Sequence, residues 1–226
     1  MKKFIFLFTQ ITFILPSLAQ ESTNPINNTV QGLGFESFDM TVGFVNAKRM
    51  TEGSAYYFEN WNTESTIYIK DKGRVKIEKV NINLFDNTLE AIYDDNSVFT
   101  FNSDNLLKIV INAKVFRIFE INNEPKILEQ FFKGDFSIYR HYSVIYTEGS
   151  ANPMLSRKTN KFIKKAKYYL YRDDKLTMVK MTKKSFAKLL HSEKVSPEAI
   201  LNHIKENKLS INKEDDLIQV LNFISN

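Results

Sequence analysis

Few side chains in this chain could perform acid–base or nucleophilic chemistry, since it holds three histidines and no cysteine. The lack of cysteine excludes thiol nucleophiles, redox motifs, zinc sites built on thiolates and a lipid-modified cysteine. His191 is expected near a helix C-terminus and His203 on the solvated face of a helix, where each has a structural explanation. His141 lies in an expected strand, on the side of Tyr139 and Ser143. It could act as a general base only beside an orienting carboxylate, which the spacing does not identify, so a packed or exposed strand residue is the alternative.

The acidic residues that cluster in the sequence each have a backbone explanation. Asp94-Asp95 and Asp173-Asp174 fall in expected turns, and Glu214-Asp215-Asp216 falls in the first turn of an expected helix. Neither Asp pair has the alternating oxygen ligands around a glycine that a calcium loop needs. The nucleophile elbow, phosphate loop, dinucleotide fingerprint and zinc-protease helix motif are all missing. The sequence therefore predicts no catalytic residue, no cofactor and no metal ligand; a hydrolase whose carboxylates converge only in the fold is the alternative.

The strongest departure from an ordinary surface is a basic segment near residue 160. Residues 151–194 hold 13 Lys and Arg against 3 Asp and Glu, whereas residues 20–150 hold 13 against 18. The candidate surface-binding residues are Arg157, Lys158, Lys161, Lys164, Lys165 and Lys167. Such a block favours attachment to an anionic envelope surface, an acidic polysaccharide or an acidic protein, and Phe162-Ile163 could add apolar insertion at a membrane. The alternative is a solubilising loop. Nucleic acid fits the charge, but neither the expected export nor any recognition motif supports it.

The aromatic segment Tyr56-Tyr57-Phe58-Glu59-Asn60-Trp61 is a second candidate contact surface. Its rings occupy both faces of a short run, and an exposed aromatic strip can stack on sugars or seat a peptide. Tyr57 and Trp61 are the candidate contact residues, and Trp61, between two asparagines, is expected to be partly exposed. The alternative is that these rings pack in the core at the start of the sheet.

The elements that must position these residues are mostly strands, because Phe and Tyr are abundant and apolar residues alternate in short runs. About ten such runs, the first of them Ala55–Phe58, span residues 36–181, which predicts an antiparallel β-sandwich or open barrel. Asp71-Lys72-Gly73 is expected to form a hairpin turn. Within Arg74–Leu84 the apolar parity changes near Glu78-Lys79, which predicts a bulge. Residues 147–165 are expected to form the one extended loop.

The period changes to helical over residues 182–226, where three short amphipathic helices are expected to pack together and against the β domain. Thr182 is expected to cap the first helix. Ser196-Pro197-Glu198 has the hydroxyl, the proline and the acid of a helix start. Asn212 is expected to open the last helix. The predicted fold class is therefore mainly β with an α-helical C-terminus.

The first residues carry the pattern of a secretory signal peptide, expected to span residues 1–19. Met1-Lys2-Lys3 is basic, Phe4–Leu15 is mostly apolar, and Pro16-Ser17-Leu18-Ala19 ends in small residues. The apolar run is shorter than the ~20 residues of a membrane-spanning helix, so no transmembrane helix is expected in the mature chain. Residues 20–35 are polar and are expected to form a flexible leader. The protein is therefore expected to be exported, to the periplasm or outside the cell.

Two groups of residues resemble a set of exported, β-rich proteins of unknown function from Bacteroidetes-type bacteria. The first group is Gly53-Ser54-Ala55-Tyr56-Tyr57-Phe58 with Trp61, followed by Lys79-Val80-Asn81-Ile82-Asn83-Leu84 and Asn87-Thr88-Leu89-Glu90. The second is a strand pair at 166–181, followed by a lysine-rich helix and two terminal helices. The resemblance covers most of residues 50–226, implies export and a folded single domain, and supplies no catalytic residue.

The function predicted from these observations is a non-enzymatic binding or structural module for a protein, a polysaccharide or an anionic surface. A hydrolase acting on cell-envelope material and a barrel with an enclosed small-ligand cavity are the alternatives.

Overall fold

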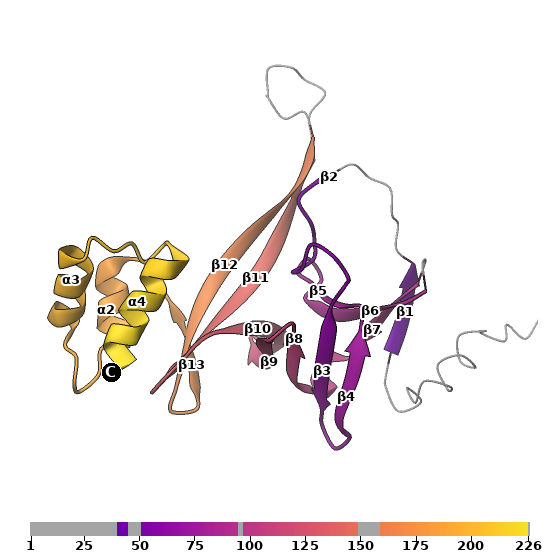
Figure 1. Ribbon diagram of the computed structural model, residues 1–226, viewed down its shortest axis with the longest axis horizontal. Coiled ribbons are helices and arrows are strands. Elements are labelled where there is room, and N and C mark those ends of the chain that lie inside the picture. The colour runs from indigo at the N-terminus through magenta and orange to yellow at the C-terminus, as the bar shows by residue number, and fades with distance from the viewer. Residues whose placement is uncertain (1–39, 45–50, 95–96, 149–158, 226) are drawn as a thin grey trace, which may run out of the picture. The chain divides into compact units, whose positions relative to one another are not determined.

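The computed structural model describes residues 40–44, 51–94, 97–148 and 159–225. The expected signal peptide (1–19), the expected leader (20–35) and two candidate basic residues, Arg157 and Lys158, lie outside these residues. The described strands form two sheets, whose elements are labelled in Figure 1. The smaller sheet has the strand order β1-β7-β6-β5. Its strands are β1 (Met40–Phe44), β5 (Val80–Asn83), β6 (Thr88–Asp94) and β7 (Ser97–Phe101).

The larger sheet has the order β13-β12-β11-β10-β9-β8-β3-β4, and β2 pairs with β12. All its pairings are antiparallel except that between β2 and β12. Its strands are β2 (Thr51–Glu52), β3 (Glu64–Ile69), β4 (Gly73–Glu78), β8 (Leu106–Ile111), β9 (Lys114–Ile121), β10 (Glu124–Lys133), β11 (Ser137–Thr147), β12 (Asn160–Arg172) and β13 (Lys175–Val179). Both sheets are open, so the fold is not a closed barrel.

The prediction of a mainly β fold with a helical C-terminus is confirmed, although the described strands number thirteen. One expected strand is not regular: Ala55–Phe58 makes only an isolated bridge, between Tyr56 and Asn83. Another expected strand, Arg74–Leu84, is two strands in two different sheets. Those two corrections follow from how the chain passes between the sheets.

The chain changes sheet at Lys79, which has a left-handed backbone with φ of 54°. β4 before it pairs with β3 in the larger sheet, and β5 after it pairs with β6 in the smaller one. The Lys79 N–H donates to the carbonyl oxygen of Thr63 at 3.0 Å, which anchors the crossing point. The change of apolar parity near this residue is real, but its cause is a crossover and not the expected bulge. Apolar alternation in the sequence shows that the strand pattern changes near this residue, but it does not show in which sheet the next strand lies.

Short polar turns close the hairpins of the larger sheet. Asn112 and Ala113 have φ of 46° and 66° between β8 and β9, and Asp173 and Asp174 have φ of 52° and 55° between β12 and β13. Two successive left-handed residues match the right-handed twist of the flanking strands, and Asn and Asp tolerate this conformation. The expected hairpin turn at 71–73 also forms, between β3 and β4.

The C-terminal helices share one core with the end of the larger sheet. They are α2 (Lys183–Leu190), α3 (Pro197–Glu206) and α4 (Glu214–Ser225). The buried side chains of this core include Ile138, Leu170 and Val179 from β11–β13 and Phe186, Leu190, Ile200, Ile204, Val220 and Leu221 from the helices.

The Ser196 side chain accepts a hydrogen bond from the Ala199 N–H at 3.2 Å, as expected for a cap, whereas the Thr182 side chain makes no such bond. Within the described residues, no helix is long and apolar enough to cross a membrane.

Candidate functional site

The distal half of the β11–β12 hairpin extends beyond the neighbouring strands of the larger sheet. β11 and β12 stay paired from Ser137–Tyr171 out to Thr147–Lys161. β10 pairs with β11 only as far as Arg140, and β13 pairs with β12 only from Tyr168 onward. Residues 141–147 and 161–167, here called the arm, therefore form a two-stranded ribbon that the rest of the sheet does not flank, except where β2 meets its end. Figure 1 shows this ribbon running away from the other strands.

The described part of the basic segment forms one strand of this arm, so the prediction of a loop over 147–165 is wrong for Thr147 and for residues 160–165. Lys161, Lys164, Lys165 and Lys167 all lie on β12. Lysine is depleted in strands, which is why its density favoured a loop. The strand forms because its backbone pairs with β11, residue by residue, whatever the side chains are.

The pairing register sorts the arm's side chains onto two faces. Cross-strand partners point to the same side of a sheet, and successive residues alternate. One side, here called the lysine face, carries His141, Ser143, Ile145 and Thr147 with their partners Lys167, Lys165, Ile163 and Lys161. Lys164 falls on the opposite face, where its Nζ donates to the Tyr57 carbonyl oxygen at 3.4 Å and burial lowers its pKa. The structure therefore brings three of the four described lysines together and separates the fourth.

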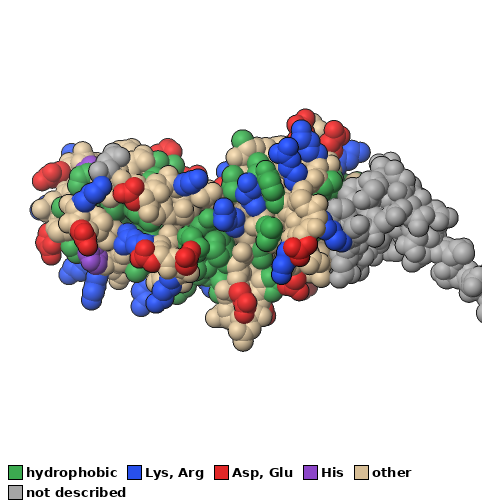
Figure 2. All heavy atoms as spheres, turned by 90° about the horizontal axis from the view of Figure 1, so that it is seen from below, with side chains coloured by type: hydrophobic (Ala, Val, Ile, Leu, Met, Phe, Trp, Pro, Cys, Tyr) green, Lys and Arg blue, Asp and Glu red, His purple; other side chains and the backbone are tan. Residues whose placement is uncertain are grey.

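The lysine face combines uncompensated charge with exposed apolar surface. Lys161 pairs with Glu52 at 2.6 Å, but no ion pair in the described part of the chain includes Lys165 or Lys167. Ile145 and Ile163, which are direct cross-strand partners, are 44% and 46% exposed. Elsewhere the charges are mixed: Figure 2 shows one face of the molecule on which acidic and basic side chains are interspersed with hydrophobic ones. The lysine face is therefore the strongest candidate for a binding surface.

His141 lies at the base of the lysine face without the partner that general-base chemistry needs. It is half-buried, and its Nε2 lies 3.3 Å from the Asn87 side-chain oxygen. Burial, followed by the positive charges of Lys126 and Lys167, lowers the pKa of His141 to about 4. An imidazole surrounded by an amide and two cations is neutral at pH 7 and has no orienting carboxylate.

The depressed pKa of His141 predicts a specific loss of stability in acid. Its folded-state pKa, about 4, lies below the ordinary value of 6.5, so protons bind the unfolded chain more tightly. The contribution of neutral His141 to the free energy of unfolding is therefore complete above pH 6.5 and is lost as the pH falls towards 4. Between pH 6.5 and pH 4, we expect the free energy of unfolding to fall by about 1–2 kcal/mol more in wild type than in a His141→Gln variant. This is less than the full pKa shift would give, because solvent screens the half-buried site. Urea unfolding of both proteins at pH 6.5 and pH 4 measures the difference, and equal losses would contradict the assignment.

The aromatic candidates Tyr57 and Trp61 lie away from the lysine face. The Tyr57 ring meets Phe116 and Tyr142 edge-on, with centroids 5.1 and 5.5 Å apart. Burial, then the negative charge of Glu129, raises the pKa of the Tyr57 hydroxyl. Trp61 is half-buried and packs edge-on against Tyr56 at 4.8 Å. These contacts support the core-packing alternative for the segment.

A buried ionic network, which the sequence did not indicate, lies behind Tyr57. Glu129 on β10 and Arg140 on β11 are each 4% exposed and are joined by hydrogen bonds of 2.8 and 2.9 Å. Glu129 also accepts from Lys114 at 2.8 Å, and Arg140 donates to Glu214 at the start of α4 at 2.7 Å. Burial alone would raise the pKa of Glu129, but the bonds from Lys114 and Arg140 outweigh it and hold that pKa below its ordinary value. The sequence held one sign of this burial: Glu129 lies two residues after the apolar Ile127, so both side chains point to the same face of the strand.

A second buried carboxylate, Glu90, is held by neutral donors. It accepts hydrogen bonds from the Tyr56 hydroxyl at 3.0 Å, from the Asn83 amide at 3.0 Å and from the Thr88 hydroxyl at 2.9 Å. Both buried glutamates therefore have their oxygens engaged by structural partners. In these contacts neither glutamate meets a histidine or the other glutamate, so they do not form the paired acids that glycoside hydrolysis uses.

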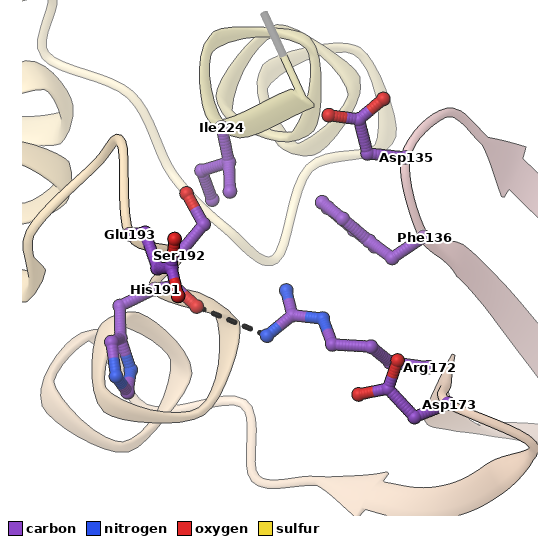
Figure 3. A pocket seen from close by; sticks show the side chains of 8 residues that line it. All are labelled: Asp135, Phe136, Arg172, Asp173, His191, Ser192, Glu193 and Ile224. Carbon is purple, nitrogen blue, oxygen red and sulfur yellow. Dashed lines mark hydrogen bonds between the residues drawn. The ribbon is translucent and has the colours of Figure 1, made fainter.

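A cavity of about 550 Å³ lies where the β10–β11 turn approaches the C-terminal end of α2. Its lining residues, drawn in Figure 3, are Asp135, Phe136, Arg172, Asp173, His191, Ser192, Glu193 and Ile224. The Arg172 guanidinium donates to the carbonyl oxygens of His191 and Leu190 at 3.0 and 3.2 Å, so it satisfies the open end of the helix. Figure 3 shows the His191 ring turned away from that guanidinium. This arrangement terminates a helix and pairs no acid with a base.

The remaining tests concern metals and relatives. In the described ranges, no three His, Asp or Glu side chains converge in a way that could hold a metal ion. Compared with models of known protein families, with curated proteins and with solved structures, the chain matches none of them.

Proposed function

We propose that this chain is an exported, non-enzymatic binding module that attaches to an anionic surface of the cell envelope through the lysine face of its arm. The observation that carries the proposal is the position of Lys165 and Lys167, next to each other on one side of a ribbon and without an ion pair among the described residues. Export rests on the basic, apolar and small-residue pattern of residues 1–19.

Charge distribution supports a defined orientation on such a surface. The arm holds four lysines and no Asp or Glu, whereas residues 20–150 as a whole carry five more acidic than basic residues. An anionic surface attracts the arm and repels the acidic part of the chain, and both effects weaken as salt screens them. The module would therefore bind by its arm and would release at high ionic strength.

The hydrolase alternative has less support. His141 has no carboxylate partner, and the two buried glutamates, Glu90 and Glu129, are engaged in structural hydrogen bonds. A catalytic pair of carboxylates needs at least one that can reach substrate. The hydrogen bonds of Glu90 and Glu129 give both residues a structural role in the fold. Their burial therefore favours the binding module over the hydrolase.

A co-sedimentation experiment tests the attachment. The chain from residue 20 onward is mixed with purified envelope fractions at low and high salt, beside a Lys165→Gln, Lys167→Gln variant. Each lysine near an anionic surface contributes about 1 kcal/mol, so the double variant is expected to bind about thirtyfold more weakly. A Lys183→Gln, Lys184→Gln variant is the control, because it removes the same charge from exposed positions on α2.

The control makes the outcome decisive. If both double variants lose affinity equally, net charge drives the association and the arm is not the attachment site. If wild-type protein fails to sediment with any envelope fraction, the proposal is wrong.

A further inference from the structure

We infer that the partner of the lysine face is a phospholipid bilayer containing anionic lipids, into whose surface Ile145 and Ile163 insert. This inference rests on the proposed function and narrows the anionic surface to one chemical class.

The apolar pair distinguishes a bilayer from a purely charged partner. Ile145 and Ile163 face each other across the arm and are both nearly half exposed. The other large exposed hydrophobic side chains among the described residues are Phe85, Leu107 and Met178, and no two of them are cross-strand partners. A polysaccharide could neutralise the lysines but would leave this pair in water, whereas a bilayer removes it from water.

The lysines are spaced so that they could reach phosphate groups while the isoleucines insert. Lys161 and Lys165 lie two residues before and two residues after Ile163 on the same strand and face, so each is about 7 Å away along the ribbon. A lysine lays its methylene stem along apolar surface and keeps its ammonium group in the polar layer. The ion pair between Lys161 and Glu52 joins two half-exposed side chains, and a lipid phosphate can replace it.

The opposite face of the arm packs against the segment around Tyr57. Tyr142 meets the Tyr57 ring edge-on, and Lys164 donates to the Tyr57 carbonyl oxygen. Val144, which is on the same face, is buried. The lysine face is therefore the side of the ribbon that is free to approach a membrane.

A fluorescence experiment locates the insertion. Trp61 is the chain's single tryptophan, so a Trp61→Phe background leaves an introduced tryptophan as the only reporter. Ile163→Trp in this background is mixed with vesicles of phosphatidylcholine, with or without phosphatidylglycerol. We expect its emission to shift to the blue and to be quenched by brominated acyl chains only when phosphatidylglycerol is present. Leu107→Trp in the same background reports an exposed position on β8, away from the arm, and is expected to stay unshifted.

Affinity measurements separate insertion from charge. Ile145→Ser with Ile163→Ser is expected to weaken binding to phosphatidylglycerol vesicles about thirtyfold, because two half-exposed side chains no longer leave water. The Leu107→Ser control is expected to bind like wild type. Circular dichroism of each variant confirms that the sheet is retained.

Each outcome has one meaning. Binding to phosphatidylglycerol vesicles with unshifted emission at position 163 would overturn insertion and leave electrostatic attachment standing. Binding to envelope fractions but not to vesicles would overturn the lipid assignment and identify a polysaccharide or acidic protein as the partner. If wild type binds neither envelope fractions nor vesicles, both the inference and the proposed function fail.

Discussion

Replacing Glu129 by glutamine is expected to lower the free energy of unfolding by about 3 kcal/mol. The substitution keeps the side-chain volume and removes the charge that Arg140 and Lys114 face. Arg140 then remains buried with Glu214 as its only anionic partner in the described contacts, and a buried cation that loses a partner is costly. Arg140 retains that second bond, which places the expected loss at the lower end of about 3–5 kcal/mol for broken buried pairs.

Urea denaturation measures this loss, with Glu124→Gln as the control. Glu124 pairs with Lys126 at an exposed position, so removing its charge is expected to leave the unfolding midpoint unchanged. The double variant Glu129→Gln, Arg140→Met removes both buried charges and is expected to lose less than the sum of the two single variants. A Glu129→Gln midpoint equal to that of wild type would show that the network contributes no net stability.

Replacing Phe186 by alanine is expected to cost about 3–5 kcal/mol, because the ring is 1% exposed at the centre of the core between helices and strands. The cavity would lie between α2 and the β11–β13 side chains that pack against it. Since one core serves both, we expect a single unfolding transition in which helical and sheet signals are lost together at a lower denaturant concentration.

Phe85→Ala is the matched control for this experiment. The Phe85 ring is 57% exposed, so its removal is expected to change stability by less than about 0.5 kcal/mol. If Phe186→Ala instead produced two transitions, with the sheet melting at its wild-type midpoint, the helices would be an independent unit. That result would contradict the shared core.

Stability and binding depend on different residues of this protein. Phe186 and the Glu129–Arg140 pair are buried and do not reach the lysine face. The side chains of Lys165, Lys167, Ile145 and Ile163 are exposed, so their substitution is expected to change binding with little change in stability. Binding and folding can therefore be tested separately in this protein.

Features that depend on neighbours along the chain could be predicted from the amino-acid sequence. Apolar alternation indicated the mainly β class, and Asn, Asp and Gly identified hairpin turns such as 71–73. Ser196 and Pro197 located the start of α3. These signals are local because backbone conformation and capping depend on a few consecutive residues.

Features that depend on pairing between distant residues became visible only in the folded structure. Lys79 sends the chain into another sheet, and the lysine-rich segment becomes a strand because β11 pairs with it. Once this segment is a strand, alternation along it separates Lys164 from Lys165 and Lys167, and the register with β11 brings Ile145 beside Ile163. Arg140 meets Glu129 across the β10–β11 hairpin and also meets Glu214 on α4, which lies 74 residues further along the chain. Twelve residues separate β11 from β12, so no short turn fixes the register that pairs these two strands.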